Sequence, residues 1–365
     1  MIYVHVPFCR SFCTYCDFYS EVAHKVAGRF DAYIKALDAE IFARAGEITS
    51  DCNTLYVGGG TPSVLPPSFF SGLVATLKKA GVNTAFDEFT VEVNPEDIVE
   101  KGQGYVEALL EAGVNRISMG IQSLDDSILK WMNRPHTSRE AVEACYILRR
   151  AGVKNLSVDL IFGISHLGMD VWKDTVERIL GLGVEHISCY QLSIEPGSML
   201  CTLVGKGRYK EADEELCREQ YELLCSMLSA EGFRHYEISN FAKEGYCSRH
   251  NSAYWKYVPD TGFGPGAHSF SFDGKTASRS WNKADLKAYV AAFSGEGKEN
   301  IVSREVLTSE QMRMERIMLG LRTAEGVQRY LLPEGDLPLV DLGNGYWRIP
   351  ESDFFISDSI ISSLI

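Results

Sequence analysis

Short apolar runs alternate with longer amphipathic stretches along the first two thirds of the chain. The apolar runs are rich in β-branched and aromatic residues and are bounded by turn residues, as is typical of strands. They cover residues 2–6, 54–58, 89–93, 116–120, 156–163 and 186–192. The stretches between them repeat apolar residues at helical spacing, and several end in glycine, a preferred helix C-cap. They cover residues 29–45, 68–81, 104–113, 138–152 and 170–183.

This alternation of strand and helix predicts the fold class. Near-continuous apolar strands joined by helices indicate parallel βαβ units whose sheet is covered on both faces. Six such units make a barrel or an open doubly wound sheet. In both architectures the functional residues follow the carboxyl ends of the strands. We therefore expect an α/β fold with its site at that edge of the sheet.

The chain changes character near residue 235. A helical stretch at 211–232 leads into residues 236–270, which are rich in aromatic residues, Gly and His. That composition predicts strands and loops more than helix. We expect a barrel domain over residues 1–235.

The remaining residues predict a smaller domain over 236–365. Residues 303–323 have the pattern of a helix, and an Asn-Gly pair lies between the apolar runs within 339–350. Asn-Gly between apolar runs is a strong hairpin signal. A helix followed by a hairpin predicts a carboxyl-terminal α+β domain that is winged-helix-like.

Composition and charge narrow the classes of function. The 365 residues are 45% hydrophobic and 11% aromatic, which fits a packed globular protein. The formal net charge of -13 argues against nucleic acid as a partner, because binding to a phosphate backbone requires clustered Lys and Arg. Residues 1–10 carry no secretory pattern, and no run of 18 apolar residues occurs, so we expect a cytoplasmic protein.

Three of the ten cysteines form a cluster. Cys9, Cys13 and Cys16 fall within eight positions. In a long chain that we expect to be intracellular, reduced thiols for metal binding or burial are favoured over disulfides. We expect the scattered cysteines to be small buried hydrophobic residues. These are Cys52, Cys145, Cys189, Cys201, Cys217, Cys225 and Cys247.

Three clustered sulfurs fit more than one kind of metal centre. A zinc ion takes four protein ligands, or three and a water. A 4Fe–4S cluster takes four cysteines, so three would leave one iron without a protein ligand. S-adenosylmethionine can chelate that iron through its amino and carboxylate groups, which places its sulfonium beside the cluster. Electron transfer to the sulfonium would give methionine and a deoxyadenosyl radical.

Residues 9–16, "CRSFCTYC", resemble the signature of the radical S-adenosylmethionine superfamily. Its members are built on a partial or full βα barrel with this motif after the first strand, so the resemblance implies a partial (β/α)6 barrel here. It also implies that Cys9, Cys13 and Cys16 bind a 4Fe–4S cluster. The positions it assigns to S-adenosylmethionine are Tyr3, Tyr15, Gly59, Gly60, Thr61, Glu92, Gln122, Arg134 and Asp159.

The chemistry of these positions suits that cofactor. The Gly-rich segment at 56–63 matches the one whose backbone meets the methionyl amino group. Glu92 and Asp159 can accept from ribose hydroxyls or an ammonium, and the guanidinium of Arg134 matches a carboxylate bidentately. Each of these residues alone is more often a surface or capping residue. Together, after successive strands of one barrel, they favour a cofactor site.

Segments along nearly the whole chain resemble the family of the oxygen-independent coproporphyrinogen oxidase and related haem chaperones. They include "YVHVPFC", "EVNPED", "RISMGIQSL", "SRHNSAYW" and "GFGPGAHS". The oxidase has a fourth cysteine where Phe18 stands, and a long segment before the motif. Both departures, with "HNSAYW" at 250–255, favour the haem-chaperone branch.

The resemblance implies that the chain binds haem and passes it to an acceptor protein. The acceptor is either associated with a membrane or not. The cluster would need an electron donor. Whether the chain forms a homodimer is left open. His250 is the candidate haem ligand, followed by His268 and His5. The alternative for His250 is a hydrogen-bonded structural histidine. The rival functions are oxidative decarboxylation of coproporphyrinogen and radical modification of RNA, which the acidic balance disfavours.

Overall fold

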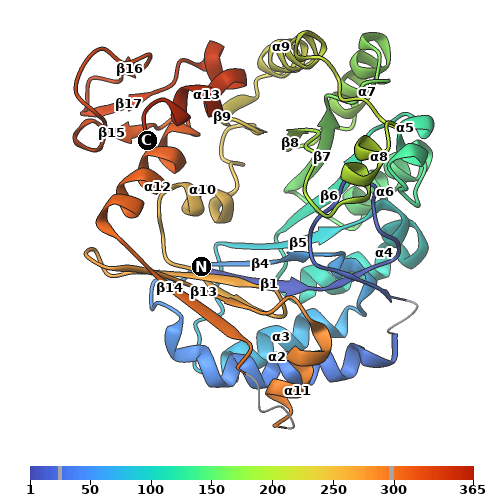
Figure 1. Ribbon diagram of the computed structural model, residues 1–365. Helices are drawn as coiled ribbons and strands as arrows, with labels where there is room; N and C mark the ends of the chain where they lie inside the picture. Colours follow the sequence, from blue (N-terminus) through green and yellow to red (C-terminus); the bar gives the residue numbers. More distant parts are fainter. Residues whose placement is uncertain (24–26, 296–299) are drawn as a thin grey trace.

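The computed structural model describes residues 1–23, 27–295 and 300–365, and its centre is a nine-stranded sheet (Figure 1). The strand order is β11-β1-β4-β5-β6-β7-β8-β10-β9. Six of these strands run parallel in chain order. They are β1 (Ile2–Val6), β4 (Thr54–Gly59), β5 (Glu88–Val93), β6 (Arg116–Gln122), β7 (Leu156–Phe162) and β8 (His186–Gln191). The predicted α/β fold with its six parallel strands is confirmed.

Helices on the outside of this sheet connect and cover the strands (Figure 1). They are α2 (Phe30–Arg44), α3 (Ser68–Lys79), α4 (Pro95–Glu111), α5 (Asp126–Trp131), α6 (Ser138–Arg150), α7 (Met169–Gly181), α8 (Met199–Gly205) and α9 (Glu214–Ala230). The sequence at α6 explains its start, because Thr137 and Glu140 form a capping box that satisfies free backbone N–H groups. Its buried face then packs apolar residues onto the sheet.

Strands that begin at residue 234 or later extend the sheet at both ends. β10 (Asn240–Ala242) pairs antiparallel with β8, and β9 (Arg234–Glu237) pairs antiparallel with β10. At the other end, β11 (Thr261–Phe263) runs parallel to β1. The predicted boundary therefore falls inside β9 and does not separate the barrel sheet from the carboxyl-terminal residues. Where a second domain begins stays a prediction.

The carboxyl-terminal third adds two small antiparallel sheets and several helices. One sheet holds β12 (His268–Phe272), β13 (Ala277–Asn282) and β14 (Val302–Leu307), and the other holds β15 (Val327–Gln328), β17 (Tyr346–Arg348) and β16 (Val340–Asp341). The helices are α10 (Arg249–Trp255), α11 (Leu286–Phe293), α12 (Ser309–Leu321) and α13 (Ser357–Ser362). Figure 1 places α12, α13 and the second small sheet together at one end of the molecule.

Two predictions for this third have opposite outcomes. The hairpin at the Asn-Gly pair is confirmed, since β16 and β17 pair antiparallel around it. The helix predicted over 303–323 is wrong at its start, because β14 pairs with β13 up to Leu307. The capping box of Thr308 and Gln311 then sets the start of α12.

All ten cysteines are free thiols. Among the scattered seven, burial is confirmed for Cys52, Cys145, Cys189 and Cys217, whereas Cys201, Cys225 and Cys247 are only half-buried. In the described ranges, no helix combines the length and the apolar character that crossing a membrane requires.

Candidate functional site

A cavity of about 990 Å³ opens where the parallel strands end. This volume is at the upper end of the range typical of small-molecule sites. Eleven of the thirteen predicted site residues line it: Cys9, Cys13, Tyr15, Cys16, Gly59, Gly60, Thr61, Glu92, Gln122, Arg134 and Asp159. The sheet thus brings together residues that are up to 150 positions apart in sequence (residues 9 and 159).

The loop that carries the three cysteines is anchored at both ends and in the middle. It leaves from β2 (Phe8–Cys9) and returns through β3 (Glu21–Val22), and these two short strands pair in parallel. At its centre Thr14 is buried. The Thr14 N–H donates to Met132 O at 2.9 Å, and its hydroxyl donates to Trp131 O at 2.9 Å. The loop is therefore held against the end of α5.

The cysteine sulfurs have polar neighbours inside the cavity. Thr61 Oγ1 donates to Cys9 Sγ and Arg134 Nη1 donates to Cys13 Sγ, each at 3.5 Å. Burial raises the pKa of the Cys9 thiol, and burial together with the neighbouring Cys13 and Cys9 raises the pKa of Cys16 to about 12. These thiols become thiolates when a metal compensates the burial of their charge.

The donor set suits an iron–sulfur cluster better than one metal ion. Within the ranges that the structure describes, no three His, Cys, Asp or Glu side chains are arranged to hold a single ion. The three cysteines lie instead on the wall of one cavity. Three thiol ligands spread over one wall fit a cube of four irons that uses one cysteine for each of three irons.

The Gly-rich segment lies directly against the cysteine loop. Gly60 N–H donates to Val6 O at 2.8 Å, and Thr61 N–H donates to Phe8 O at 2.6 Å. A Cβ on Gly60 would lie 2.6 Å from Phe8 O and 3.0 Å from Cys9 Sγ. Only glycine permits this close approach of two backbones. The result is a cradle of backbone next to the cysteines.

Two carboxylates lie deeper in the cavity. Glu92 Oε1 accepts from Tyr56 OH at 2.7 Å, and Oε2 accepts from Gly59 N–H at 3.1 Å. Burial raises the pKa of Glu92 to about 7, and the nearby Asp159 adds to this increase. Asp159 accepts from Ser118 Oγ at 3.4 Å, and burial also raises its pKa. A cationic or hydroxyl-bearing ligand would relieve the cost of burying these groups.

Arg134 and Gln122 occupy the end of β6. Arg134 Nη2 donates to Gly120 O at 2.6 Å and to Asn94 Oδ1 at 2.8 Å. Its Nε is buried, with no hydrogen-bond partner among the described residues. Gln122 has a φ of 68°, and the register of β6 against β7 shifts between Gly120 and Gln122. Such a backbone is uncommon outside glycine and occurs at functional sites.

Two predicted residues do not line the cavity. The Tyr3 hydroxyl is 3.2 Å from His5 Nδ1, in the layer behind the lining. His250 is buried, with Nδ1 2.9 Å from Thr54 Oγ1 and Nε2 3.1 Å from Tyr254 OH. Neither ring nitrogen is free to coordinate iron. These contacts fit the alternative of a hydrogen-bonded structural histidine and do not favour His250 as the haem ligand.

The other two candidate histidines differ from each other. His5 is buried, and its Nε2 lies 2.9 Å from Tyr19 O. His268 is exposed and stacks on Trp281 with ring centroids 5.7 Å apart. Neither lines the main cavity.

Sequence reasoning missed several residues of the site. Arg116 and Tyr190 line the cavity, and so do Phe12 and Met199, whose side chains are exposed. A charged residue at the start of an otherwise apolar strand was an available signal for Arg116. The exposed apolar residues carried no signal, because exposure depends on the folded neighbours.

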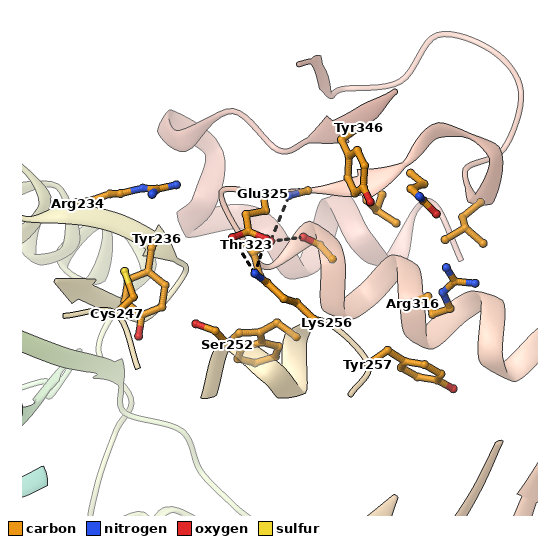
Figure 2. Close-up of a pocket in the computed structure, with 16 residues that line it drawn as sticks. Arg234, Tyr236, Cys247, Ser252, Lys256, Tyr257, Arg316, Thr323, Glu325 and Tyr346 are labelled. Carbon is orange, nitrogen blue, oxygen red and sulfur yellow. Dashed lines mark hydrogen bonds and ion pairs between the residues drawn. The ribbon is translucent and has the colours of Figure 1, made fainter. Parts of the chain in front are cut away.

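A second cavity of about 340 Å³ lies between α10, α12 and the β15–β17 sheet (Figure 2). Lys256 reaches toward Glu325 there and pairs with it at 2.9 Å, as Figure 2 shows. Arg316 lines the same cavity and donates to Tyr330 OH at 3.1 Å. No predicted site residue lines this second cavity.

Known proteins share both the fold and the motifs. Residues 3–179 match the Radical SAM superfamily. Over 332 residues the chain is 34% identical to the "Heme chaperone HemW" of Bacillus subtilis, which covers 90% of this chain and 84% of that protein. Over 352 residues it is 32% identical to the bovine "Radical S-adenosyl methionine domain-containing protein 1, mitochondrial", covering 93% and 77%.

A solved structure supports the fold. Coproporphyrinogen III oxidase (HemN) from Escherichia coli, a radical SAM enzyme, superposes with a TM-score of 0.73 at 22% identity. The match covers 88% of this chain and 75% of the oxidase. Taken with the sequence relatives, these matches show that the chain belongs to the HemW family of the radical S-adenosylmethionine superfamily.

Proposed function

We propose that this protein carries haem and passes it to an acceptor protein, while a 4Fe–4S cluster and S-adenosylmethionine occupy the main cavity. The observation that carries this proposal is the cavity wall itself. It holds three cysteines, with the exposed side chain of Phe18 in place of a fourth. Relatives named heme chaperones align with about nine tenths of the chain, which supports the same function.

The residues present fit both resident groups. Cys9, Cys13 and Cys16 would each hold one iron, and a bound cluster would supply the electron for reductive cleavage of the sulfonium of S-adenosylmethionine. Arg134, whose Nε has no hydrogen-bond partner within residues 1–23, 27–295 and 300–365, would bind the methionyl carboxylate. The backbone cradle at Gly60 would receive the amino group, and the buried Glu92 would accept from a hydroxyl or ammonium.

A haemin titration tests the cargo. The purified chain with reconstituted cluster would be titrated with haemin while the Soret band is followed. We expect saturation at one haem per chain. Absorbance that increases in proportion to free haemin, without saturation, would overturn the proposal.

Turnover separates this function from the oxidase. The reconstituted protein would be given S-adenosylmethionine, a reductant and coproporphyrinogen III, and the porphyrins would be separated after oxidation. We expect no decarboxylated product. Protoporphyrinogen formed over many turnovers would replace the haem-carrier proposal with the oxidase.

A further inference from the structure

Arg116 is a buried cation in the wall of the main cavity. It is the first residue of β6, it lines the cavity, and its exposed fraction is only 1%. Within the described ranges, every other lysine and arginine is more exposed than Arg116. A buried guanidinium on a central strand requires a reason in its surroundings.

Protein groups do not supply that reason. Across residues 1–23, 27–295 and 300–365, the Arg116 side chain makes no hydrogen bond or ion pair, and its Nε is buried without a partner. Arginine stays protonated in proteins, so it cannot escape the penalty by losing its charge. A buried charge without a partner is strongly destabilising. An anion from outside the chain would remove this cost.

Within the described residues, the two nearby carboxylates form no ion pair with Arg116. Both oxygens of Glu92 already accept hydrogen bonds, from Tyr56 and from Gly59. Burial raises the pKa of Glu92 to about 7, so this carboxyl is partly protonated near neutral pH, and burial also raises the pKa of Asp159. Arg116 influences both only through space and forms no ion pair with either within the described chain.

Arg116 and Arg134 approach the cavity from opposite ends of β6. Arg134 contacts Cys13 and the carbonyl of Gly120 at the cysteine end. Along β6, Arg116 precedes Gly120 by four residues, which is about 13 Å of strand at the usual rise per residue. Arg116 acts through space on Glu92 and Asp159, which are also expected to contact S-adenosylmethionine, so cofactor affinity in an Arg116 variant distinguishes a second ligand from the cofactor.

The mouth of the cavity has the opposite chemistry. Three large apolar side chains are both exposed and part of the cavity lining: Phe12, Phe18 and Met199. Exposed apolar side chains offer a surface that an apolar ligand can cover. A single ligand satisfies both ends if it has a broad apolar body and an acidic arm.

We propose that Arg116 binds a carboxylate of a second ligand, and that this ligand is a tetrapyrrole with propionate side chains. The apolar macrocycle contacts the aromatic mouth, and one propionate reaches the guanidinium. This inference rests on the proposed function, since it gives the haem cargo a site in the main cavity. It assigns that site to Arg116 and leaves His250 in a structural role.

The test compares two ligands and two forms of the reconstituted protein. Haemin has two free propionate carboxylates, which are neutral methyl esters in haemin dimethyl ester. We expect wild type to bind haemin about tenfold or more tighter than the diester, because a charged hydrogen bond is lost. In Arg116→Gln, haemin affinity should fall by about tenfold and the preference over the diester should disappear.

Three further measurements assign the effect to this residue. Arg116→Lys keeps the charge and should retain part of the preference for haemin over the diester. This variant tests the inference even if Arg116→Gln does not fold. Arg316→Gln makes the same change in the second cavity and should leave haemin affinity unchanged. Iron content and S-adenosylmethionine affinity should be unchanged in Arg116→Gln.

Several outcomes would overturn the inference. One is an intact preference for haemin in Arg116→Gln, which leaves the haem-carrier proposal standing. Weaker S-adenosylmethionine binding in that variant would assign Arg116 to the cofactor instead, and a loss of haemin binding confined to Arg316→Gln would move the site to the second cavity. If wild type binds no haemin, the haem-carrier proposal fails, and coproporphyrin III with its tetramethyl ester then tests Arg116 alone.

Discussion

Arg134 donates a hydrogen bond to the thiol of Cys13 at 3.5 Å, although the two residues are 121 positions apart. The same guanidinium donates to the carbonyl of Gly120 at the end of β6. One side chain therefore joins the cysteine loop to the central sheet. The residue expected to bind the cofactor therefore also contacts Cys13, one of the three expected cluster ligands.

Replacing this arginine should affect both groups. In Arg134→Met we expect S-adenosylmethionine affinity to fall by at least about tenfold, because a bidentate charged contact is lost. Iron should also be lost faster to a chelator, since Cys13 loses its contact with the arginine. Calorimetric titration and iron analysis measure the two effects. Arg150→Met, at an exposed ion pair with Glu143, is the control. Unchanged cofactor binding would contradict the assignment of Arg134.

The three clustered cysteines should differ from the scattered ones in their effect on iron. Cys13→Ala should abolish the cluster, because two cysteines do not hold the cube. Iron and sulfide per chain, with the absorbance of the cluster, measure this. Cys145→Ala removes a buried thiol from α6 and should lower the melting temperature while iron content is retained. Full iron content in Cys13→Ala would show that the motif does not bind the cluster.

The close approach at Gly60 predicts a strong effect of one methyl group. In Gly60→Ala, the new Cβ would meet the backbone oxygen of Phe8 at 2.6 Å, so the two loops must separate. We expect reduced cluster occupancy with little change in circular dichroism. Gly72→Ala in α3 meets nothing within 4 Å and is the matched control. Equal iron content in the two variants would mean that the cradle is not needed.

The sequence predicted the fold and most of the site because both depend on regular spacing. Apolar runs of strand length located all six parallel strands, and parallel strands bring their carboxyl ends to one edge. Eleven predicted residues meet in the cavity for this reason. The start of α12 was misplaced because β14 owes its conformation to pairing with β13, and pairing between distant segments leaves little local signal.

Single side chains were harder to predict than strands. His250 lies in a motif that resembles a haem-binding one, yet its surroundings come from β4 and from its own helix. Arg116 was counted as part of a strand, although its charge made it the unusual residue there. Whether a polar side chain is satisfied depends on distant neighbours, which spacing along one chain does not reveal.

Glu92 should make the stability of the protein depend on pH. Its pKa is raised by burial from an ordinary value of 4.5 to about 7, so the folded chain holds a proton that the unfolded chain loses. Stability from this group is therefore complete below about pH 4.5 and is lost as pH rises through 7, by at most about 1.4 kcal/mol per pH unit.

A variant that cannot ionise tests this dependence. In Glu92→Gln, without ligands, we expect the melting temperature to fall less steeply than in wild type between about pH 4.5 and pH 7, the window between the ordinary and the raised pKa of Glu92. Glu219→Gln, at an exposed position of α9, should keep the wild-type slope. Identical slopes for wild type and Glu92→Gln would mean that Glu92 is not the group that holds the proton.

His250 should matter for stability and not for iron binding. Its ring joins Thr54 of β4 to Tyr254 of α10, and burial lowers its pKa to about 3, so it stays neutral near pH 7. His250→Ala leaves a buried hydroxyl without its partner, which costs about 1–3 kcal/mol. We expect a lower melting temperature with unchanged cluster content and unchanged haem stoichiometry. His250→Gln, which can form part of the same contacts, should recover some of the loss. A weaker Soret band at an unchanged melting temperature would instead restore His250 as the haem ligand and require its ring to leave the position between Thr54 and Tyr254.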